Sequence, residues 1–325
     1  MSNITMKEVA VRAGVSLATV SHVINGTRYV SKETTERVMS AIKDLSYVPN
    51  VAARSFKMGK RYMIGFIIPN IANNFYSTII EEIETVISKR GYSLLLSNTK
   101  ESPERELNAI HTLSSGMVDG LILASTHQNY HEIKPAIPDH FPVICVDRVL
   151  EDNEADVVGI SSQDALYDAA KTLLECGHKK LGFIAFSNIR SPNMERLENF
   201  KKAIDKLGFP MENVHIEYAL TGTNHVFQLA DHLYQNGVTG ILAANNLITL
   251  DLIRWSMDRH LALKTDVDII GYYADELFPE MLNISSIHMP TSNMGELAGE
   301  LMLHRLQHPN APIVNHVLHS NFILR

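Results

Sequence analysis

The sequence has few cysteines and no long apolar run. Only two cysteines, Cys145 and Cys176, occur in 325 residues, which excludes a disulfide framework and favours a reducing compartment. No stretch approaches 18 consecutive apolar residues, and the first residues lack the apolar run of a secretory signal. The composition, with 45% hydrophobic and 20% charged residues, is typical of a globular protein, and the length suggests two or three cores. We therefore expect a cytoplasmic protein without a membrane partner.

The sequence also lacks the motifs that carry common catalytic chemistry. It contains no G-x-G-x-x-G, no P-loop and no G-x-S-x-G pattern. His304 and His308 have the i,i+4 spacing of a helical metal site but lack the glutamate of H-E-x-x-H. His316 and His319 fall on a predicted strand, where an odd spacing points them to opposite faces. We expect no enzyme activity, no cofactor and no metal site.

Charge is distributed unevenly along the chain. Residues 1–60 hold nine Lys or Arg and four acids, so their net charge is +5. Because the whole chain has a net charge of −7, the remaining residues have a net charge of −12. A basic segment attached to an acidic one is expected when the first contacts phosphate and the second does not. A chance fluctuation of solvated surface charge stays open on this observation alone.

The first fifty residues contain the start and stop signals of three short helices. Thr5 and Glu8 form a capping box, and the helix that they begin ends at Gly14, where a positive φ is tolerated. Ser16 and Ser31 are placed to cap a second and a third helix. Two helices joined by a glycine-containing turn of this length predict a helix-turn-helix.

The second predicted helix has an inward and an outward face. Leu17, Ala18, Ser21, His22 and Asn25 share the outward face, which would enter the major groove. Leu17 and Ala18 could contact a thymine methyl group, and His22 could bond to a base edge or a phosphate. The alternative is a helical bundle that exposes two apolar residues without a function.

A run of more than fifty residues resembles the head and hinge of one repressor family. The run is MKEVAVRAGVSLATVSHVINGTRYVSKETTERVMSAIKDLSYVPNVAARSFK, and it is similar to the LacI/GalR family. The matching pieces are the VAxxAGVS turn, the TVSHVIN helix and the YxPN…ARS hinge. The resemblance implies a head at 1–48, a hinge helix and linker at 49–60, and an effector-binding and dimerisation core at 61–325. It also implies double-stranded operator DNA as a partner and a homodimer with two-fold symmetry.

The hinge adds a second kind of predicted DNA contact. Pro49 would end the third helix, and Asn50 would cap a short helix that is marginal off DNA and forms on it. The resemblance implies that Phe56, where the family usually has leucine, is an apolar wedge in the minor groove. Packing of Phe56 between head and core is the alternative. The complete predicted DNA-binding set is Thr5, Ser16, Leu17, Ala18, Ser21, His22, Asn25, Arg28, Asn50, Ala53, Arg54, Phe56 and Lys57.

From residue 61 onward, short apolar strands alternate with helical stretches. This alternation predicts an α/β fold of parallel sheets with helices on both faces, and its length predicts two lobes. The predicted strands are 62–68, 92–97, 118–124, 143–146, 181–185, 240–244 and 267–270. The resemblance implies a periplasmic-binding-protein-like core with lobe one at about 61–160 and 289–318, and lobe two at about 161–288 and 319–325. The effector would bind between the lobes.

Matches to the family pattern propose the effector-binding residues. Phe75 and Tyr76 would offer ring faces for stacking, and Arg190 and Arg196 would form hydrogen bonds with the effector. A solvent-facing surface charge is the alternative for each arginine. The complete predicted set is Phe75, Tyr76, Asp147, Arg148, Ser161, Arg190, Arg196, Asn246, Tyr273 and Asp275.

Several positions depart from the acidic pattern of the family. Ser161-Ser162, Asn245-Asn246 and Tyr273-Ala274 stand where sugar-binding relatives usually carry a carboxylate. Loss of acids near two arginines predicts an anionic effector such as a sugar phosphate or an organic acid. Two alternatives remain, a neutral sugar with Asp275 replacing the lost acid, and a degenerate pocket with little affinity.

Taken together, these patterns predict a sequence-specific DNA-binding transcriptional repressor that is controlled by a sugar, sugar phosphate or related metabolite. One alternative is a DNA-binding regulator that is independent of an effector or is regulated by another protein. A solute-binding receptor is a weaker alternative because it needs a signal peptide and has no use for residues 1–60.

Overall fold

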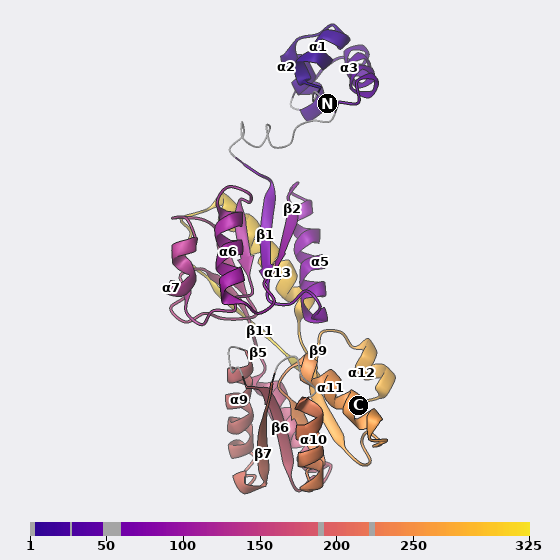
Figure 1. The fold of residues 1–325 in the computed structure, drawn as a ribbon, viewed down its shortest axis with the longest axis vertical. Coiled ribbons are helices and arrows are strands. Elements are labelled where there is room, and N and C mark those ends of the chain that lie inside the picture. Colours follow the sequence, from indigo (N-terminus) through magenta and orange to yellow (C-terminus); the bar gives the residue numbers. More distant parts are fainter. Residues whose placement is uncertain (1–3, 27, 48–59, 188–191, 221–224) are drawn as a thin grey trace. The chain divides into compact units, whose positions relative to one another are not determined.

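The computed structural model describes residues 4–26, 28–47, 60–187, 192–220 and 225–325. It divides into two compact units, Met1–Arg61 and Tyr62–Arg325, which we call the head and the core (Figure 1). Within the described ranges, no helix combines the length and the apolar character that crossing a membrane would need.

The described part of the head is a bundle of short helices. They are α1 (Met6–Ala13), α2 (Leu17–Asn25) and α3 (Lys32–Asp44). Apolar side chains from all three fill a small centre, because each helix has one apolar face. The buried members are Val9, Ala10, Ala13, Val20, Val38, Ala41 and Tyr47.

The predicted helix caps are confirmed. Thr5 and Glu8 form the capping box, with the backbone N–H of Thr5 donating to Glu8 Oε2 at 2.6 Å. The hydroxyl oxygens of Ser16 and Ser31 accept from the backbone amide three residues later, at 3.1 Å and 3.4 Å. Gly14 has φ 64° and ends α1, so the turn into α2 adopts the left-handed conformation that glycine favours.

The core contains two six-stranded sheets. The first has the strand order β11-β5-β4-β3-β1-β2, and the second has the order β12-β10-β9-β8-β6-β7. All neighbours pair in parallel except β10 and β12, which are antiparallel. The first sheet consists of β1 (Met63–Ile68), β2 (Ser93–Asn98), β3 (Gly120–Leu123), β4 (Val143–Val146), β5 (Asp156–Ser161) and β11 (Asn315–His319). The second consists of β6 (Leu181–Phe186), β7 (Val214–Ala219), β8 (Gly240–Ala243), β9 (Asp268–Tyr273), β10 (Ser286–His288) and β12 (Asn321–Ile323).

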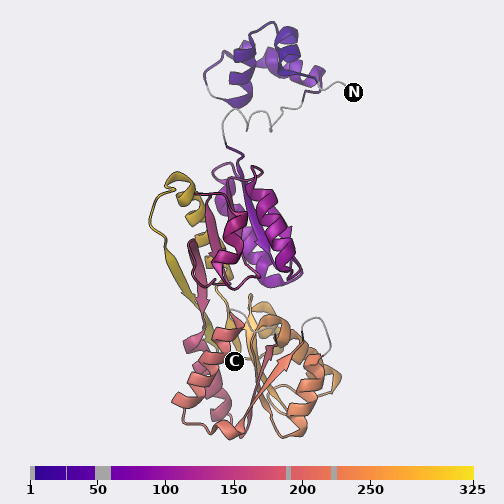
Figure 2. The same cartoon turned by 60° about the vertical axis from the view of Figure 1, so that its left-hand side comes forward.

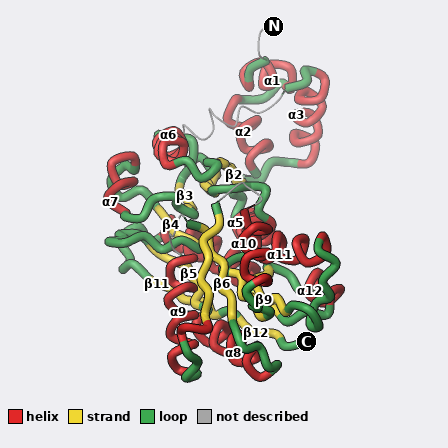
Figure 3. The backbone as a smooth tube through the Cα atoms, turned by 60° about the horizontal axis from the view of Figure 1, so that its bottom comes forward, coloured by secondary structure: helices red, strands yellow, loops and turns green. Residues whose placement is uncertain are grey.

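Helices cover both faces of each sheet (Figure 3). On the first sheet, α5 (Asn74–Ser88) and α13 (Thr291–Gln307) pack on one face, and α6 (Pro103–Ser114) and α7 (Tyr130–Ile133) pack on the other. On the second, α8 (Gln163–Glu175) and α9 (Asn193–Lys206) oppose α10 (His225–Gln235), α11 (Asn246–Asp258) and α12 (Leu277–Leu282). Short 3-10 turns occur at Lys134–Ala136 and Met211–Asn213. Because the inner strands are buried on both faces, their sequences are largely apolar, with polar residues mainly at the strand ends.

The chain passes between the two sheets three times. It leaves the first sheet after β5, returns between β10 and α13, and leaves again between β11 and β12. Figure 2 shows β11 beside β5 at the edge of the first sheet, where their register pairs Asn315 with Val157. Three parallel connections between two lobes are the arrangement in which hinge motion can open or close a cleft.

The predicted α/β class is confirmed, and all seven predicted strands are present with ends displaced by up to three residues. The list of predicted strands lacks β10 and β12, which are three residues long, and β7, which lies at the edge of the second sheet. Its sequence VHIEYA is only partly buried and mixes polar with apolar side chains, so it lacks the apolar run that marks an inner strand.

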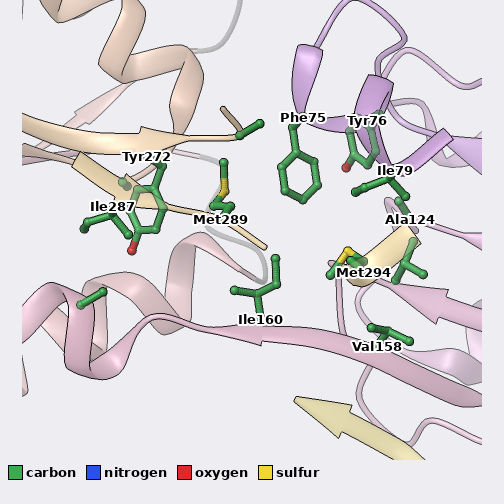
Figure 4. Packing of buried hydrophobic residues seen from close by; sticks show 14 of the residues in the cluster. Phe75, Tyr76, Ile79, Ala124, Val158, Ile160, Tyr272, Ile287, Met289 and Met294 are labelled. Carbon is green, nitrogen blue, oxygen red and sulfur yellow. The ribbon is translucent and has the colours of Figure 1, made fainter. Parts of the chain in front are cut away.

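Close helix packing and a continuous apolar cluster hold the core together. α13 approaches α5 at Gly295 and Gly299, where a Cβ atom on Gly295 would lie 2.7 Å from the carbonyl oxygen of Ile79. One buried apolar cluster also includes side chains from both lobes. Figure 4 shows part of it, with Phe75 and Tyr76 from the first lobe and Tyr272 from the second.

Candidate DNA interface and effector cleft

The start of α2 presents an exposed apolar surface. Leu17 is 52% exposed, and Ala18 beside it is also exposed. Ser21 and His22, one turn further along, are half-buried. An exposed leucine can contact a thymine methyl group, and the backbone N–H groups of the same helix N-terminus can bind a phosphate within one turn of it. Leu17 and Ala18 therefore lie on the exposed surface of the head, and Ser21 and His22 are partly accessible one turn away.

Three other predicted residues border this surface. Thr5 and Ser16 are exposed, and each uses its hydroxyl oxygen to cap a helix, so the same side chains fix the helix ends that would face phosphate. Arg28 is exposed after α2. The side chain of Asn25 lies outside the described part of the structure, as do Asn50, Ala53, Arg54, Phe56 and Lys57, which stay predictions.

Sequence reasoning missed Tyr29, which is 91% exposed and follows Arg28 directly. A large aromatic next to arginine in a segment between two helices could have been noticed as a candidate phosphate or base contact. Charge in the head is only partly neutralised internally, since Arg12 pairs with Asp44 at 3.1 Å on its exposed surface.

In the core, Phe75 and Tyr76 begin α5 at the boundary between the lobes. Asn73 caps this helix by accepting from the backbone N–H of Phe75 at 3.1 Å. Both rings are buried and meet edge to face, with centroids 5.0 Å apart. The Tyr76 hydroxyl donates to Asp147 Oδ2 at 3.1 Å. Burial, the charge of Asp147 and this hydrogen bond raise the pKa of Tyr76, so the phenol is a neutral donor.

Asp147 and Arg148 follow the end of β4 and form a charged group with Glu101. Arg148 binds Glu101 through two hydrogen bonds of 2.6 Å and 2.8 Å. Burial raises the pKa of Asp147, and the charges of Arg196 and Arg148 act against that rise. The charge of Arg148 is thus paired, which leaves less of it for an effector. The sequence did not predict the pairing of Glu101 with Arg148, because the two residues are 47 positions apart.

Arg196 on α9 is buried, so it is not a solvent-facing charge. Only 5% of it is exposed, and its guanidinium carbon lies 4.0 Å from the centre of the Tyr272 ring. One nitrogen donates to the carbonyl oxygen of Ala244 at 2.9 Å, and the other lies 3.7 Å from Met289 Sδ. A guanidinium stacked on an aromatic ring is preorganised for a planar hydrogen-bonding partner. Arg190 lies outside the described residues.

Asn246 links the two lobes directly. At the start of α11, its amide nitrogen donates to Asn73 Oδ1 at 2.7 Å and to Asn74 Oδ1 at 3.1 Å. The neighbouring Asn245 caps α11 by accepting from the backbone N–H of Ile248 at 3.0 Å. Asn245 therefore fixes the start of α11, and Asn246 holds the two lobes together.

A cavity of about 150 Å³ lies beside this contact. It brings together three predicted residues, Asn246, Tyr273 and Asp275. Tyr273 is buried, and its hydroxyl has no hydrogen-bond partner within the described part of the chain, while Asp275 is exposed. The full lining is Asn74, Asn246, Leu250, Tyr273, Ala274, Asp275 and Phe278. Ser161 lies at the end of β5 and is half-buried.

A buried carboxylate behind the charged group was also missed. Glu106 accepts from the backbone N–H of Thr126 at 2.6 Å, from the Ser125 and Thr126 hydroxyls, and lies 3.4 Å from His127 Nδ1. Burial acts to raise the pKa of Glu106, but the close contact with His127 and the hydrogen bonds from Ser125 and Thr126 outweigh it and lower the pKa. Glu106 therefore fixes the loop after β3, whose Ser125 carbonyl accepts from Arg148 at 3.3 Å.

The chain combines a helix-turn-helix head with a two-lobed α/β core, and the core contains a cavity between its lobes. This combination defines a ligand-controlled DNA-binding regulator. Comparison with known proteins identifies the family. The model for "Bacterial regulatory proteins, lacI family" matches residues 5–50, and the model for "Periplasmic binding proteins and sugar binding domain of LacI family" matches residues 61–289. The chain belongs to the lacI family of bacterial transcriptional regulators, and the resemblance seen in its sequence is confirmed.

Curated relatives match along nearly the whole chain. The ribose operon repressor of Escherichia coli (strain K12) is 33% identical over 313 residues, which covers 94% of both chains. The HTH-type transcriptional repressor PurR of Haemophilus influenzae (strain PittEE) is 32% identical over 310 residues, which covers 94% of this chain and 91% of that protein. Both relatives are transcriptional repressors by name.

Solved structures share the fold. The lac repressor dimer bound to operator and the anti-inducer ONPF has a TM-score of 0.86 at 22% identity, covering 100% of this chain and 98% of that one. A LacI family regulator from Enterococcus faecium with bound ribose has a TM-score of 0.71 at 23% identity, covering 81% and 97%. At these identities the match establishes the fold and nothing finer.

Proposed function

We propose that the protein is a cytoplasmic repressor without enzymatic activity, which binds operator DNA as a homodimer and responds to a sugar bound between its lobes. The observation that carries the DNA-binding part is the exposed face of α2, where Leu17 and Ala18 project from a helix whose N-terminus is capped and solvent-exposed. Family membership and the names of the relatives support the repressor role.

Two-fold symmetry follows from the way such a head reads DNA. One head covers one half-site, and two half-sites about one helical turn apart need two heads in a symmetric pair. The operator is therefore expected to be a near-palindrome. The name of the lac repressor structure, a dimer on operator, is consistent with this arrangement.

For the effector, we favour a small neutral sugar over the anion that the missing acids suggest. The Arg148 charge is paired with Glu101, and Arg196 faces Tyr272 and the Ala244 carbonyl. The cavity lining offers amides, a phenol and one carboxylate, which can exchange hydrogen bonds with hydroxyl groups. The matched sugar-binding model and the ribose operon repressor support a sugar of pentose size.

Effector binding would act on the contact between the lobes. The cavity, at about 150 Å³, is smaller than the roughly 300–1,000 Å³ of common ligand sites, so a ligand must be small or must part the lobes. Either change alters the bonds from Asn246 to Asn73 and Asn74. A ligand with different affinities for the two lobe arrangements would thereby shift the population that binds operator.

The test uses DNA from the promoter beside the chain's own gene. Fluorescence anisotropy should show salt-sensitive binding of the full chain to a dyad-symmetric fragment and weak binding to random DNA. The matched control lacks residues 1–61 and should lose operator binding. Undiminished binding by the shortened protein would refute the assigned role of the head.

A thermal-shift screen of pentoses, hexoses and their phosphates tests the effector class. Ligands that bind the native state raise its melting temperature, and at equal concentration the tighter ligand raises it further. We expect a neutral pentose to stabilise the core more than its phosphate does. Greater stabilisation by phosphates would restore the anionic effector, and stabilisation by none would favour a regulator that is independent of an effector or is regulated by another protein.

A further inference from the structure

The C-terminal end of α13 carries two histidines that neither proposed site uses. His304 lies in the last turn of α13, and His308 is the C-cap residue that follows the helix with φ −130°. Their ring centroids are 4.7 Å apart, and the ring planes are inclined by 41°. Both residues are exposed, so solvent and ions can reach the rings. Each neutral imidazole carries one nitrogen lone pair that can bind a metal ion.

The histidines border an open concavity of about 540 Å³ between the helix end and the turn that follows. The turn is held in place by Arg305, which donates to the carbonyl oxygens of Pro309 and Pro312 at 3.3 Å and 3.0 Å. The remaining lining residues are Gln307, Pro309, Asn310 and Ala311. Arg305 therefore holds the turn that forms one side of the concavity, and the two imidazoles line it as well.

The electrostatics at this helix end favour a cation. The last carbonyl groups of a helix carry partial negative charge, and α13 extends over 17 residues. Arg305, the cation on the same turn, is paired with Asp156 through two hydrogen bonds of 2.7 Å and 2.9 Å. The buried Asp156 carboxylate thus compensates the charge of Arg305, which therefore repels an incoming cation less than an unpaired arginine would.

The spacing of the rings fits one shared metal ion. With nitrogen–metal distances of about 2.0–2.1 Å, two imidazoles on one ion have centroids roughly 4.5 Å apart at a bond angle near 90° and roughly 5.2 Å apart at the tetrahedral angle, a range that includes the observed separation. Imidazole suits zinc, copper and nickel, whereas magnesium and calcium prefer oxygen ligands. Since the described residues contain no group of three or more His, Cys, Asp or Glu that could hold a metal, water would complete the coordination. The glutamate of H-E-x-x-H is a catalytic base, so its absence argues against hydrolysis and not against binding.

We propose that His304 and His308 form a two-ligand site for a divalent transition-metal ion such as Zn²⁺ or Cu²⁺. The site lies at the surface of the first lobe, and it exchanges its ion with solvent. It is independent of the operator and effector sites proposed above.

The experiment is calorimetric titration of Zn²⁺ into full-length protein that carries no affinity tag and has been stripped with a chelator. We expect His304→Ala and His308→Ala each to weaken binding at least about tenfold, and the double variant to lose one bound equivalent. The matched control is His111→Ala combined with His131→Ala, two exposed histidines on other helices, which should retain wild-type binding. Equal stoichiometry and affinity in the wild type and the His304/His308 double variant would overturn the proposal.

One further measurement separates loss of ligands from loss of structure. Melting of the metal-free double variant, followed by circular dichroism, should match the wild type because both side chains are exposed.

Discussion

In the head, the side chains proposed to read bases lie on the surface of α2, whereas most of the effector-binding side chains proposed in the core are buried. Leu17 is 52% exposed on α2, and Arg196 is 5% exposed against Tyr272. The head needs little more than caps and a small apolar centre to present its surface. The core positions each polar group through partners that are distant in sequence, such as Asn246 with Asn73.

This difference in burial predicts that substitutions in the head and in the core will affect different properties of the protein. A substitution on the exposed face of α2 should change DNA binding without changing stability, because surface side chains contribute little to folding. A substitution in the cleft should change effector binding and stability together, because a buried polar group left without its partner costs free energy. The following variants test this contrast.

Arg196→Lys should weaken effector binding by about tenfold to a hundredfold. Lysine keeps the charge but loses the planar fork and the stacking on Tyr272, a difference of about 1.4–2.8 kcal/mol in binding. The core should also lose stability, because the Ala244 carbonyl loses its donor. Calorimetric titration with the stabilising sugar and thermal melting measure both.

The matched control for this variant is Arg254→Lys on α11, where the side chain is 74% exposed. It should leave sugar affinity and melting unchanged. Similar losses in both variants would show that burial of Arg196 is irrelevant to effector binding.

Gly295→Ala should destabilise the core by about 1–3 kcal/mol through overpacking. The new Cβ would lie 2.7 Å from both the Ile79 carbonyl oxygen and Glu82 Cβ, so α13 and α5 must move apart. Urea unfolding of the full chain reports the change, with Asn293→Ala at an exposed position of α13 as the control. A midpoint equal to that of the control would contradict the close helix contact.

Leu17→Ala should lower operator affinity about three- to tenfold, since an apolar contact with a thymine methyl is worth about 1 kcal/mol. Thermal stability and sugar affinity should stay at wild-type values. Val11→Ala, which removes an equally apolar side chain that is 77% exposed on α1, is the control. If both variants bind operator equally well, α2 is not the recognition helix.

Glu106→Gln should lower stability at neutral pH by about 1–3 kcal/mol and make it less sensitive to acid. The hydrogen bonds to Glu106 lower its pKa in the folded state, so the carboxylate stabilises the fold above the unfolded value of 4.5. That contribution is lost as pH falls through the lowered folded pKa. Urea titrations between pH 7 and pH 3 should therefore show the two proteins converging, and a constant difference would contradict the role of the carboxylate.

The elements governed by local sequence were predictable. The capping box at Thr5, the caps at Ser16 and Ser31 and the left-handed Gly14 all depend on residues within one turn of each other. Most inner strands were also predictable because burial on both faces makes their sequences largely apolar, but the three-residue inner strand β10 was not among them. The edge strand β7 has no such pattern and was missed.

The pairings inside the cleft were not predictable from spacing. Glu101 meets Arg148 across 47 residues, and Asn246 meets Asn73 across 173 residues. Such contacts form only when distant parts of the chain are brought together in the folded core, so no local sequence pattern predicts them. The resemblance to a family proposed individual positions such as Asn246 and Arg196, but it did not indicate which groups would already be paired.

The central claim is that one chain couples sugar binding in the core to operator binding by the head. Coupling between two binding equilibria is reciprocal, so the factor by which the sugar changes operator affinity must equal the factor by which operator changes sugar affinity. Calorimetric titration of the stabilising sugar into the full chain, with and without saturating operator DNA, measures this directly. We predict sugar affinities that differ at least about fivefold, corresponding to a coupling of 1 kcal/mol or more. Identical affinities with and without operator would contradict the account.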